Sequence, residues 1–410
     1  MKIESFKNNN FFEIESYDEN NRNIGYSKTS GILTGRNLFY PNTLIYDLKQ
    51  KNLISPYDEK IMSLNKDSFY DSNEYQVDNL INFNQELNPV FFFIYNFDNY
   101  YHFLYDTIGY LYVYLELKKQ IPELKILVNY PNPTKNEFYR FNLDILEKII
   151  NINDLIIVNS NIYYKNIYIS TSLTHGGLSN SPPRKELYNL YKLIKNKIVK
   201  ELTIYPKRIY ISRRTWINND ITNIGTNYTT RRKMINEDEL VTKLNKYGIQ
   251  EIFAENLSID EKINIFSSAE LIIGSIGGGM SNLLFSNKST KSIVLVTPDF
   301  LKINYRFKFS MENTDITYFE DILTYKEKNN IPLYTRVKIV KTVIIGEICD
   351  YINNKYLVNL SNNDVAGFNN EIKLEQHFFN EDELIILDNG LNSPYIVNID
   401  SLINLVKDKI

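Results

Sequence analysis

The sequence contains few of the residues that usually carry metal or redox chemistry. Among its 410 residues there are one cysteine, Cys349, and three histidines, His102, His175 and His377. A single cysteine excludes an internal disulfide and suits a reducing compartment. The spacings typical of zinc or calcium ligands are absent, as are a Walker loop and a G-x-S-x-G elbow. The sequence therefore indicates neither a metal site nor a disulfide-stabilised fold.

Long apolar runs and an excess of one charge are also missing. No run of about 18 apolar residues occurs, and residues 1–16 contain no apolar core of a signal peptide. We therefore expect a cytoplasmic protein without a transmembrane segment. Lysine and arginine number 46 against 49 aspartates and glutamates, for a net charge of -3. This balance argues against a protein that coats nucleic acid, so any anion site must be local.

What the chain does contain is enough apolar residues for several cores and many aromatic rings. Hydrophobic residues make up 43% of the sequence, and its length exceeds what one core usually fills, which predicts two or three domains. The 32 tyrosines and 23 phenylalanines have two interpretations. They follow from codon bias in an AT-rich genome, or some of them form a sugar-binding surface, since tyrosine combines an apolar face with a hydroxyl group.

Apolar runs alternate with helical patterns in the first half of the chain. Residues 1–88 are irregular and partly β. Beyond them we expect strands at 90–95, 125–129, 155–158 and 162–170, and helices at 99–119, 136–150 and 184–202. Strands that alternate with helices predict a parallel sheet covered by helices. We assign residues 1–200 to an N-terminal α/β domain whose last helix connects it to the next.

The second half begins with the clearest pattern in the sequence. Four strands are predicted at 208–212, 249–254, 271–273 and 292–296, with helices between them. Asn236 with Glu239, and Ser258 with Glu261, have the spacing of helix capping boxes. Residues 201–330 therefore predict a Rossmann-like domain. Residues 331–410 predict a β-rich appendage, with strands at 337–345, 355–360, 383–387 and 394–397 and a terminal helix at 399–407.

The loops after these four strands carry the candidate residues for an anion site. In an open α/β sheet, ligands bind outside the carboxyl ends of the strands. The loops contain Arg213, Arg214 and a second basic group at 231–233, then Glu255, and finally a glycine turn of Gly277, Gly278, Gly279, Ser281 and Asn282. Glycines let backbone N–H groups approach an anion, and the helix that follows adds its positive end. Together they predict a phosphate site, although the turn by itself is equally consistent with close packing of strand against helix.

In the first half, His102 and Asp106 lie four residues apart at the start of a helix and so share a face. A histidine beside a carboxylate is a candidate general base for an acceptor hydroxyl, or simply a hydrogen-bonded pair. Tyr101, Tyr105 and His175 are weaker candidates for contact with the acceptor.

These segments, taken together, resemble a known family. The sequence reads NYYHFLYD at 99–106, RIYISRR at 208–214, RRKMINE at 231–237, ENLS at 255–258 and IGSIGGGMSNLLF at 273–285. In this order and spacing, over residues 90–300, they resemble glycosyltransferase family 61.

The resemblance implies a GT-B fold, in which two Rossmann-like domains face each other across a cleft. It implies a nucleotide-sugar donor bound mainly by the C-terminal domain, and inversion at the anomeric carbon without a metal or cofactor. By carry-over, Arg213 and the 277–282 turn contact the donor, and Asn236 and Glu237 lie near it. His102 and Asp106 face a glycan or polysaccharide acceptor. Without an anchor, the chain looks like a bacterial or viral cytosolic member, and a homodimer stays open.

The chain also departs from the family pattern. Ile276 stands where the family usually has histidine, Leu295 where glutamate is common, and Lys262 where glutamine is expected. A non-catalytic, glycan-binding relative therefore stays an alternative. So does a dinucleotide-dependent enzyme, because Gly277-x-Gly279-x-x-Asn282 imitates the Rossmann fingerprint. That fingerprint normally follows the first strand and ends in Gly or Ala.

Overall fold

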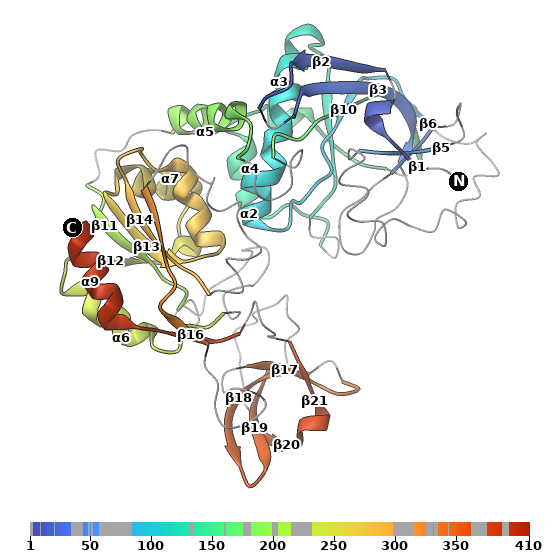
Figure 1. Ribbon diagram of the computed structural model, residues 1–410. Coiled ribbons are helices and arrows are strands. Elements are labelled where there is room, and N and C mark those ends of the chain that lie inside the picture. Colours follow the sequence, from blue (N-terminus) through green and yellow to red (C-terminus); the bar gives the residue numbers. More distant parts are fainter. Residues whose placement is uncertain are drawn as a thin grey trace. The chain divides into compact units, whose positions relative to one another are not determined.

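The protein divides into two compact units, Met1–Lys197 and Ile198–Ile410, shown in the computed structural model of Figure 1. The residues that the structure describes are 3–8, 10–19, 21–33, 44–47, 50, 52–56, 84–131, 135–159, 161–174, 182–198, 204–214, 232–297, 315–324, 331, 335–342, 344–361, 375–387 and 393–410.

The first unit is built on a mixed sheet. Its strand order is β1-β5-β4-β3-β10-β7-β8-β9, with β2 paired to β3 and β6 paired to β10. The strands are β1 (Ile3–Ser5), β2 (Phe11–Glu15), β3 (Ile24–Leu33), β4 (Ile45–Asp47), β5 (Asn52–Ser55), β6 (Asn84–Glu86), β7 (Val90–Phe92), β8 (Lys125–Val128), β9 (Leu155–Ile157) and β10 (Ile162–Ser170). The strands β10, β7, β8 and β9 run parallel, as the alternating pattern predicted. Strands from the first 55 residues extend this sheet through antiparallel pairings, apart from β1, which runs parallel to β5. The predicted parallel sheet is therefore only part of it.

The helix predicted at 99–119 is present but not uniform. It consists of α2 (Tyr100–His102), a π-helical turn (Phe103–Thr107), a 3-10 turn (Ile108–Tyr110) and α3 (Leu111–Gln120). Asn99 caps its start, where the side chain accepts a hydrogen bond from His102 N at 3.1 Å. The unit also contains α4 (Arg140–Leu146) and α5 (Lys185–Lys197). All residues of the π turn are buried, Asp106 among them.

The second unit contains a parallel sheet in the order β12-β11-β13-β14-β15. Its strands are β11 (Arg208–Ile211), β12 (Gln250–Ile252), β13 (Leu271–Ser275), β14 (Lys291–Leu295) and β15 (Asp315–Phe319). The connections include α6 (Glu237–Asn245), α7 (Ile259–Ser268) and the 3-10 helix η10 (Gly278–Phe285). The predicted βαβαβαβ unit is therefore correct, and β15 adds a strand that the pattern did not predict. The chain as a whole is of the α/β class.

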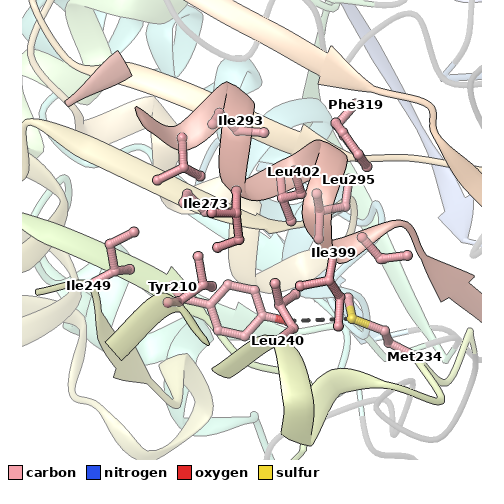
Figure 2. Close-up of a cluster of buried hydrophobic side chains, with 14 of the residues drawn as sticks. Tyr210, Met234, Leu240, Ile249, Ile273, Ile293, Leu295, Phe319, Ile399 and Leu402 are labelled. Atoms are coloured by element: carbon pink, nitrogen blue, oxygen red, sulfur yellow. Dashed lines mark hydrogen bonds between the residues drawn. The ribbon is translucent and has the colours of Figure 1, made fainter. Parts of the chain in front are cut away.

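The core of this sheet lies between the strands and two helices, α6 and α9 (Ile399–Lys409), as Figures 1 and 2 show. The side chains that fill it include Tyr210, Met234, Leu240, Ile249, Ile273, Ile293, Leu295, Phe319, Ile399 and Leu402. The prediction that the terminal helix belongs to the β-rich appendage is corrected here. Its apolar stripe, Ile399, Leu402, Ile403 and Val406, is buried in this core.

A separate antiparallel sheet in the order β20-β19-β18-β17-β21 forms the appendage. Its strands are β17 (Arg336–Ile339), β18 (Ile345–Ile352), β19 (Lys355–Ser361), β20 (Glu375–Phe379) and β21 (Leu384–Ile386). The single strand predicted at 337–345 is wrong, because a turn with Lys341 at φ 61° divides it into β17 and β18. The sheet is inserted between β16 (Ile322–Thr324) and β22 (Tyr395–Val397), which pair with each other.

Candidate functional site

A buried glutamate organises the carboxyl end of β11. Glu237 is 1% exposed, and its Oε1 accepts hydrogen bonds from Arg213 N at 2.8 Å, Tyr210 Oη at 2.8 Å and Ser212 Oγ at 3.3 Å. Burial raises the pKa of this carboxyl, while these donors and the charge of Arg213 act to lower it. Three donors on one oxygen fix the backbone from which the Arg213 side chain leaves the strand.

Arg213 lies against the glycine turn that follows β13. A Cβ on Gly277 would come within 2.8 Å of Arg213 Nη1 and 3.7 Å of Arg232 Nη2. A Cβ on the next residue, Gly278, would meet nothing within 4 Å. The turn therefore has two guanidinium groups beside its first glycine and open space beside its second. This combination of cations and bare backbone is the one expected for a phosphate site.

The other glycines of this region permit close packing. A Cβ on Gly279 would lie 2.9 Å from Ile211 Cγ2, and one on Gly274 would lie 2.6 Å from Met280 Sδ. Ser281 and Asn282 are both fully buried, and their side chains donate to the carbonyl groups of Gly278 and Gly279. Their side chains therefore stabilise the turn, and only their backbone stays a candidate for contact with a donor.

Arg214 differs from its neighbour Arg213. Its guanidinium forms a forked pair with Glu251, at 2.9 Å from Nε to Oε1 and 2.6 Å from Nη2 to Oε2, and also bonds to Asp238. The two carboxylates raise the pKa of Arg214 further. The structure thus directs Arg214 towards α6 and β12, and does not bring it to the glycine turn with Arg213.

Glu255 stands just beyond β12, in a short 3-10 turn (Ala254–Asn256). Burial raises its pKa to about 7, against the opposing charges of Lys262 and Arg213 and with support from Glu237. Within the described residues its Oε1 is buried and has no hydrogen-bond partner. A carboxyl of this kind changes its charge near neutral pH, close to the guanidinium of Arg213.

Asn236 has a role that the capping pattern did not predict. Its side chain makes no cap bond to α6; instead Nδ2 donates to Val397 O at 2.8 Å, and Oδ1 accepts from Val397 N at 3.0 Å. The predicted capping box with Glu239 is therefore wrong, whereas the one formed by Ser258 and Glu261 is present. The amide of Asn236 is used to hold β22, so this side chain is structural.

Tyr395 is the residue of this region that the sequence did not reveal. It is 2% exposed, and its hydroxyl shares a hydrogen bond of 2.5 Å with Ser275 Oγ, two residues before Gly277. Burial raises the pKa of Tyr395 to about 12, and the nearby charges of Arg213 and Arg232 oppose that rise. The sequence predicted a strand at 394–397, but nothing in the pattern indicated that Tyr395 would bond to Ser275. Arg232 belonged to a recognised basic group, and only the fold places it at the turn.

In the first unit the structure brings His102 and Asp106 together. His102 Nδ1 lies 2.6 Å from Asp106 Oδ2; the histidine side chain is 36% exposed and the aspartate side chain 1%. Thr174 Oγ1 donates to the other carboxylate oxygen at 3.4 Å. An ionised Asp106 accepts from Nδ1–H, and the other ring nitrogen, Nε2, is then the one that can accept a proton. This geometry fits a general base.

The two tyrosines predicted to contact the acceptor are buried. Tyr101 and Tyr105 are 8% and 1% exposed, and their rings stack on each other at 5.7 Å between centroids. Their faces are used inside the unit, so the prediction that they meet an acceptor does not fit their burial. His175 lies outside the described residues.

Two further observations concern the described residues alone. They contain no group of three or more histidine, cysteine, aspartate or glutamate side chains that could hold a metal ion. None of their helices is long and apolar enough to cross a membrane.

Comparison with known proteins identifies the class. The family model described as Glycosyltransferase 61 matches residues 100–293, a range that contains the His102–Asp106 pair, Arg213 and the glycine turn. The resemblance stated from the motifs is thereby confirmed over residues 100–293, which match glycosyltransferase family 61. No curated protein sequence matches the chain.

Among solved structures, the chain is similar to a dodecameric iron-containing heptosyltransferase, TibC, in complex with ADP-D-beta-D-heptose. The sequences are 11% identical, the match covers 69% of this chain and 80% of that one, and the TM-score is 0.26.

Proposed function

We propose that the chain is an inverting glycosyltransferase that moves a sugar from a nucleotide-sugar donor to a hydroxyl group of a glycan or polysaccharide acceptor. The observation that carries this proposal is the approach of Arg213 and Arg232 to Gly277 at the carboxyl edge of the parallel sheet. Guanidinium groups form forked hydrogen bonds with phosphate oxygens, and they stabilise the charge that develops on a departing diphosphate. The donor diphosphate would therefore lie on the turn at 277–279.

In this proposal His102 is the base. Its Nε2 removes the proton of the acceptor hydroxyl, whose oxygen attacks the anomeric carbon from the side opposite the diphosphate. The bond from that carbon to the diphosphate oxygen breaks, and its electron pair leaves with the diphosphate. Attack from the opposite side inverts the configuration of the carbon. Asp106 orients the imidazole and stabilises its charged form, as a buried carboxylate does beside a histidine base.

The proposal includes two further features. The two units would face each other across a cleft, in the GT-B arrangement, so that an acceptor beside His102 meets a donor held by the second unit. No metal ion is needed, because Arg213 and Arg232 supply the positive charge that a metal supplies in other transferases.

The departures from the family pattern are compatible with this function. Ile276 and Leu295 are 2% and 1% exposed, and Ile276 N donates to Leu295 O at 3.0 Å. Both are therefore part of the packing beneath the turn, where an apolar pair stands in place of polar groups. We expect the change to alter the choice of nucleotide or sugar.

The experiment is a calorimetric titration of UDP, ADP, GDP and CDP into the protein and into Arg213→Ala. Arg208→Ala is the matched control, because Arg208 is a half-buried arginine at the opposite end of the same strand. We expect at least one nucleotide to bind, and to bind about tenfold or more weakly to Arg213→Ala, since charge-assisted forked bonds are the strong ones. Arg208→Ala should bind like the wild type.

If none of the four nucleotides binds and no nucleotide sugar is hydrolysed, the proposed function is wrong. Saturable binding of NADH by the wild type would favour the dinucleotide-dependent alternative.

A further inference from the structure

The C-terminal strand β22 is attached to the loop that carries Arg232. Tyr395 N donates to Lys233 O at 3.0 Å, and Ile235 N donates to Tyr395 O at 2.9 Å. The amide of Asn236 adds its two bonds to Val397. Four hydrogen bonds thus connect a segment of four residues, 233–236, to a strand some 160 residues later. The segment directly after Arg232 is therefore held against β22.

Arg232 itself has an unfavourable backbone conformation. Its φ of 54° lies in the left-handed region, which costs a residue with a Cβ on the order of 1 kcal/mol or more. Such a conformation persists only where its surroundings impose it. The bonds between 233–236 and β22 begin at the very next residue, so they provide that constraint.

The side chain of Tyr395 reaches the other half of the site. Its hydroxyl is bonded to Ser275 Oγ at the end of β13, where the chain enters the glycine turn. Tyr395 therefore bonds through its backbone to the segment that follows Arg232, and through its side chain to the residue that leads into the glycine turn. Burial raises the pKa of this hydroxyl to about 12, and the charges of Arg213 and Arg232 act to lower it.

We propose that β22 forms part of the donor site and that Tyr395 is a positioning residue, which holds Arg232 and the Gly277 turn at the spacing that a diphosphate requires. The inference rests on the proposed function for the identity of the ligand. It adds a segment outside the family match of residues 100–293.

The test uses Tyr395→Phe, Ser275→Ala and the double variant in the full-length chain. Tyr356→Phe is the matched control, since Tyr356 is also 2% exposed and its hydroxyl accepts a hydrogen bond, from Ile331 N, in the appendage. We expect the Kd for the nucleoside diphosphate to rise about five- to tenfold in each single variant, and no further in the double variant, because the two groups act as one contact. Tyr356→Phe should keep the wild-type Kd, with a comparable change in melting temperature.

Hydrogen exchange tests the same contact without a ligand. Amides of 232–236 and 275–280 should exchange faster in Tyr395→Phe than in Tyr356→Phe. If Tyr395→Phe leaves the exchange of both segments unchanged, or binds the nucleotide within twofold of the wild type, the positioning role is wrong. If the wild type binds no nucleotide, the proposed function fails, and the exchange result alone decides whether Tyr395 holds the loop and the turn together.

Discussion

Arg213 Nη1 lies so close to Gly277 that a Cβ on the glycine would come within 2.8 Å of it. A contact of that length does not occur in folded proteins, so any larger residue at 277 must displace the guanidinium. The two residues are 64 positions apart in the sequence and meet because β11 and β13 are neighbours in the sheet. This relationship gives the candidate donor site its most specific test.

We expect Gly277→Ala to weaken binding of the nucleoside diphosphate about tenfold, because it moves Arg213 away from the turn. Calorimetry would measure the change. Gly278→Ala is the control, since a Cβ there meets nothing within 4 Å. Equal affinities of the two variants would show that the contact between Arg213 and Gly277 is not used for binding.

The adjacent arginine should give the opposite result. Arg214→Ala leaves Glu251, whose side chain is 16% exposed, without its forked partner. We expect a loss of about 1–3 kcal/mol in the free energy of unfolding, with little change in nucleotide affinity. Urea denaturation and calorimetry separate the two effects. A variant of unchanged stability that binds nucleotide poorly would reassign Arg214 to the donor site.

Glu255 should make nucleotide binding depend on pH. Its pKa of about 7 is raised by burial, and a bound diphosphate would raise it further by adding negative charge and by neutralising Arg213. Binding is then coupled to proton uptake, so the affinity should be highest below pH 7 and fall as the pH rises through 7. Glu255→Gln should remove this part of the pH dependence, and the titration of the phosphate itself is common to both proteins.

The same carboxyl should affect stability. Because its folded-state pKa lies above the unfolded value, its contribution is fully present below the unfolded value near pH 4.5 and is lost as the pH rises through about 7. The difference in free energy of unfolding between the wild type and Glu255→Gln, measured at pH 5 and pH 8, should shift in favour of the variant at the higher pH. A difference that does not vary with pH would contradict the raised pKa.

The His102–Asp106 pair should affect turnover and not donor binding. We expect His102→Ala to lower kcat for sugar transfer by about 100- to 10,000-fold, the usual contribution of a general base, with the nucleotide Kd unchanged. Asp106→Asn should also lower kcat, because the imidazole loses its orienting carboxylate. His377→Ala, in the exposed strand β20, is the control. Transfer that survives both substitutions would exclude this pair as the base.

Much of the local structure follows from the sequence. Ser258 and Glu261 form the predicted capping box, and His102 and Asp106 share a helix face because they are four residues apart. The strands β11 and β13 lie where the apolar runs placed them. These features depend on neighbours along the chain, so a pattern of residue types is enough to find them.

Patterns could not decide the direction of a side chain within a motif. Arg213 and Arg214 are adjacent and alike in chemistry, yet one lies at the glycine turn and the other between Glu251 and Asp238. Asn236 has the spacing of a cap, but its side-chain amide bonds to the backbone of Val397 and makes no cap bond to α6. The sequence made Tyr101 and Tyr105 candidates for contact with an acceptor, but both side chains are buried and their rings stack on each other. In each case the deciding partner is set by the packing of the fold.

By itself, the sequence determined the α/β class and the family resemblance, and it named two candidate regions for the chemistry. Only the tertiary structure decided which cations reach Gly277, that the side chains of Ser281 and Asn282 turn inward, and that Tyr395 bonds to Ser275 and to residues 233 and 235. The reason is physical. Helix capping and hydrophobic periodicity act over a few residues, whereas an anion site at a sheet edge is assembled from strands whose order and register depend on contacts throughout the unit.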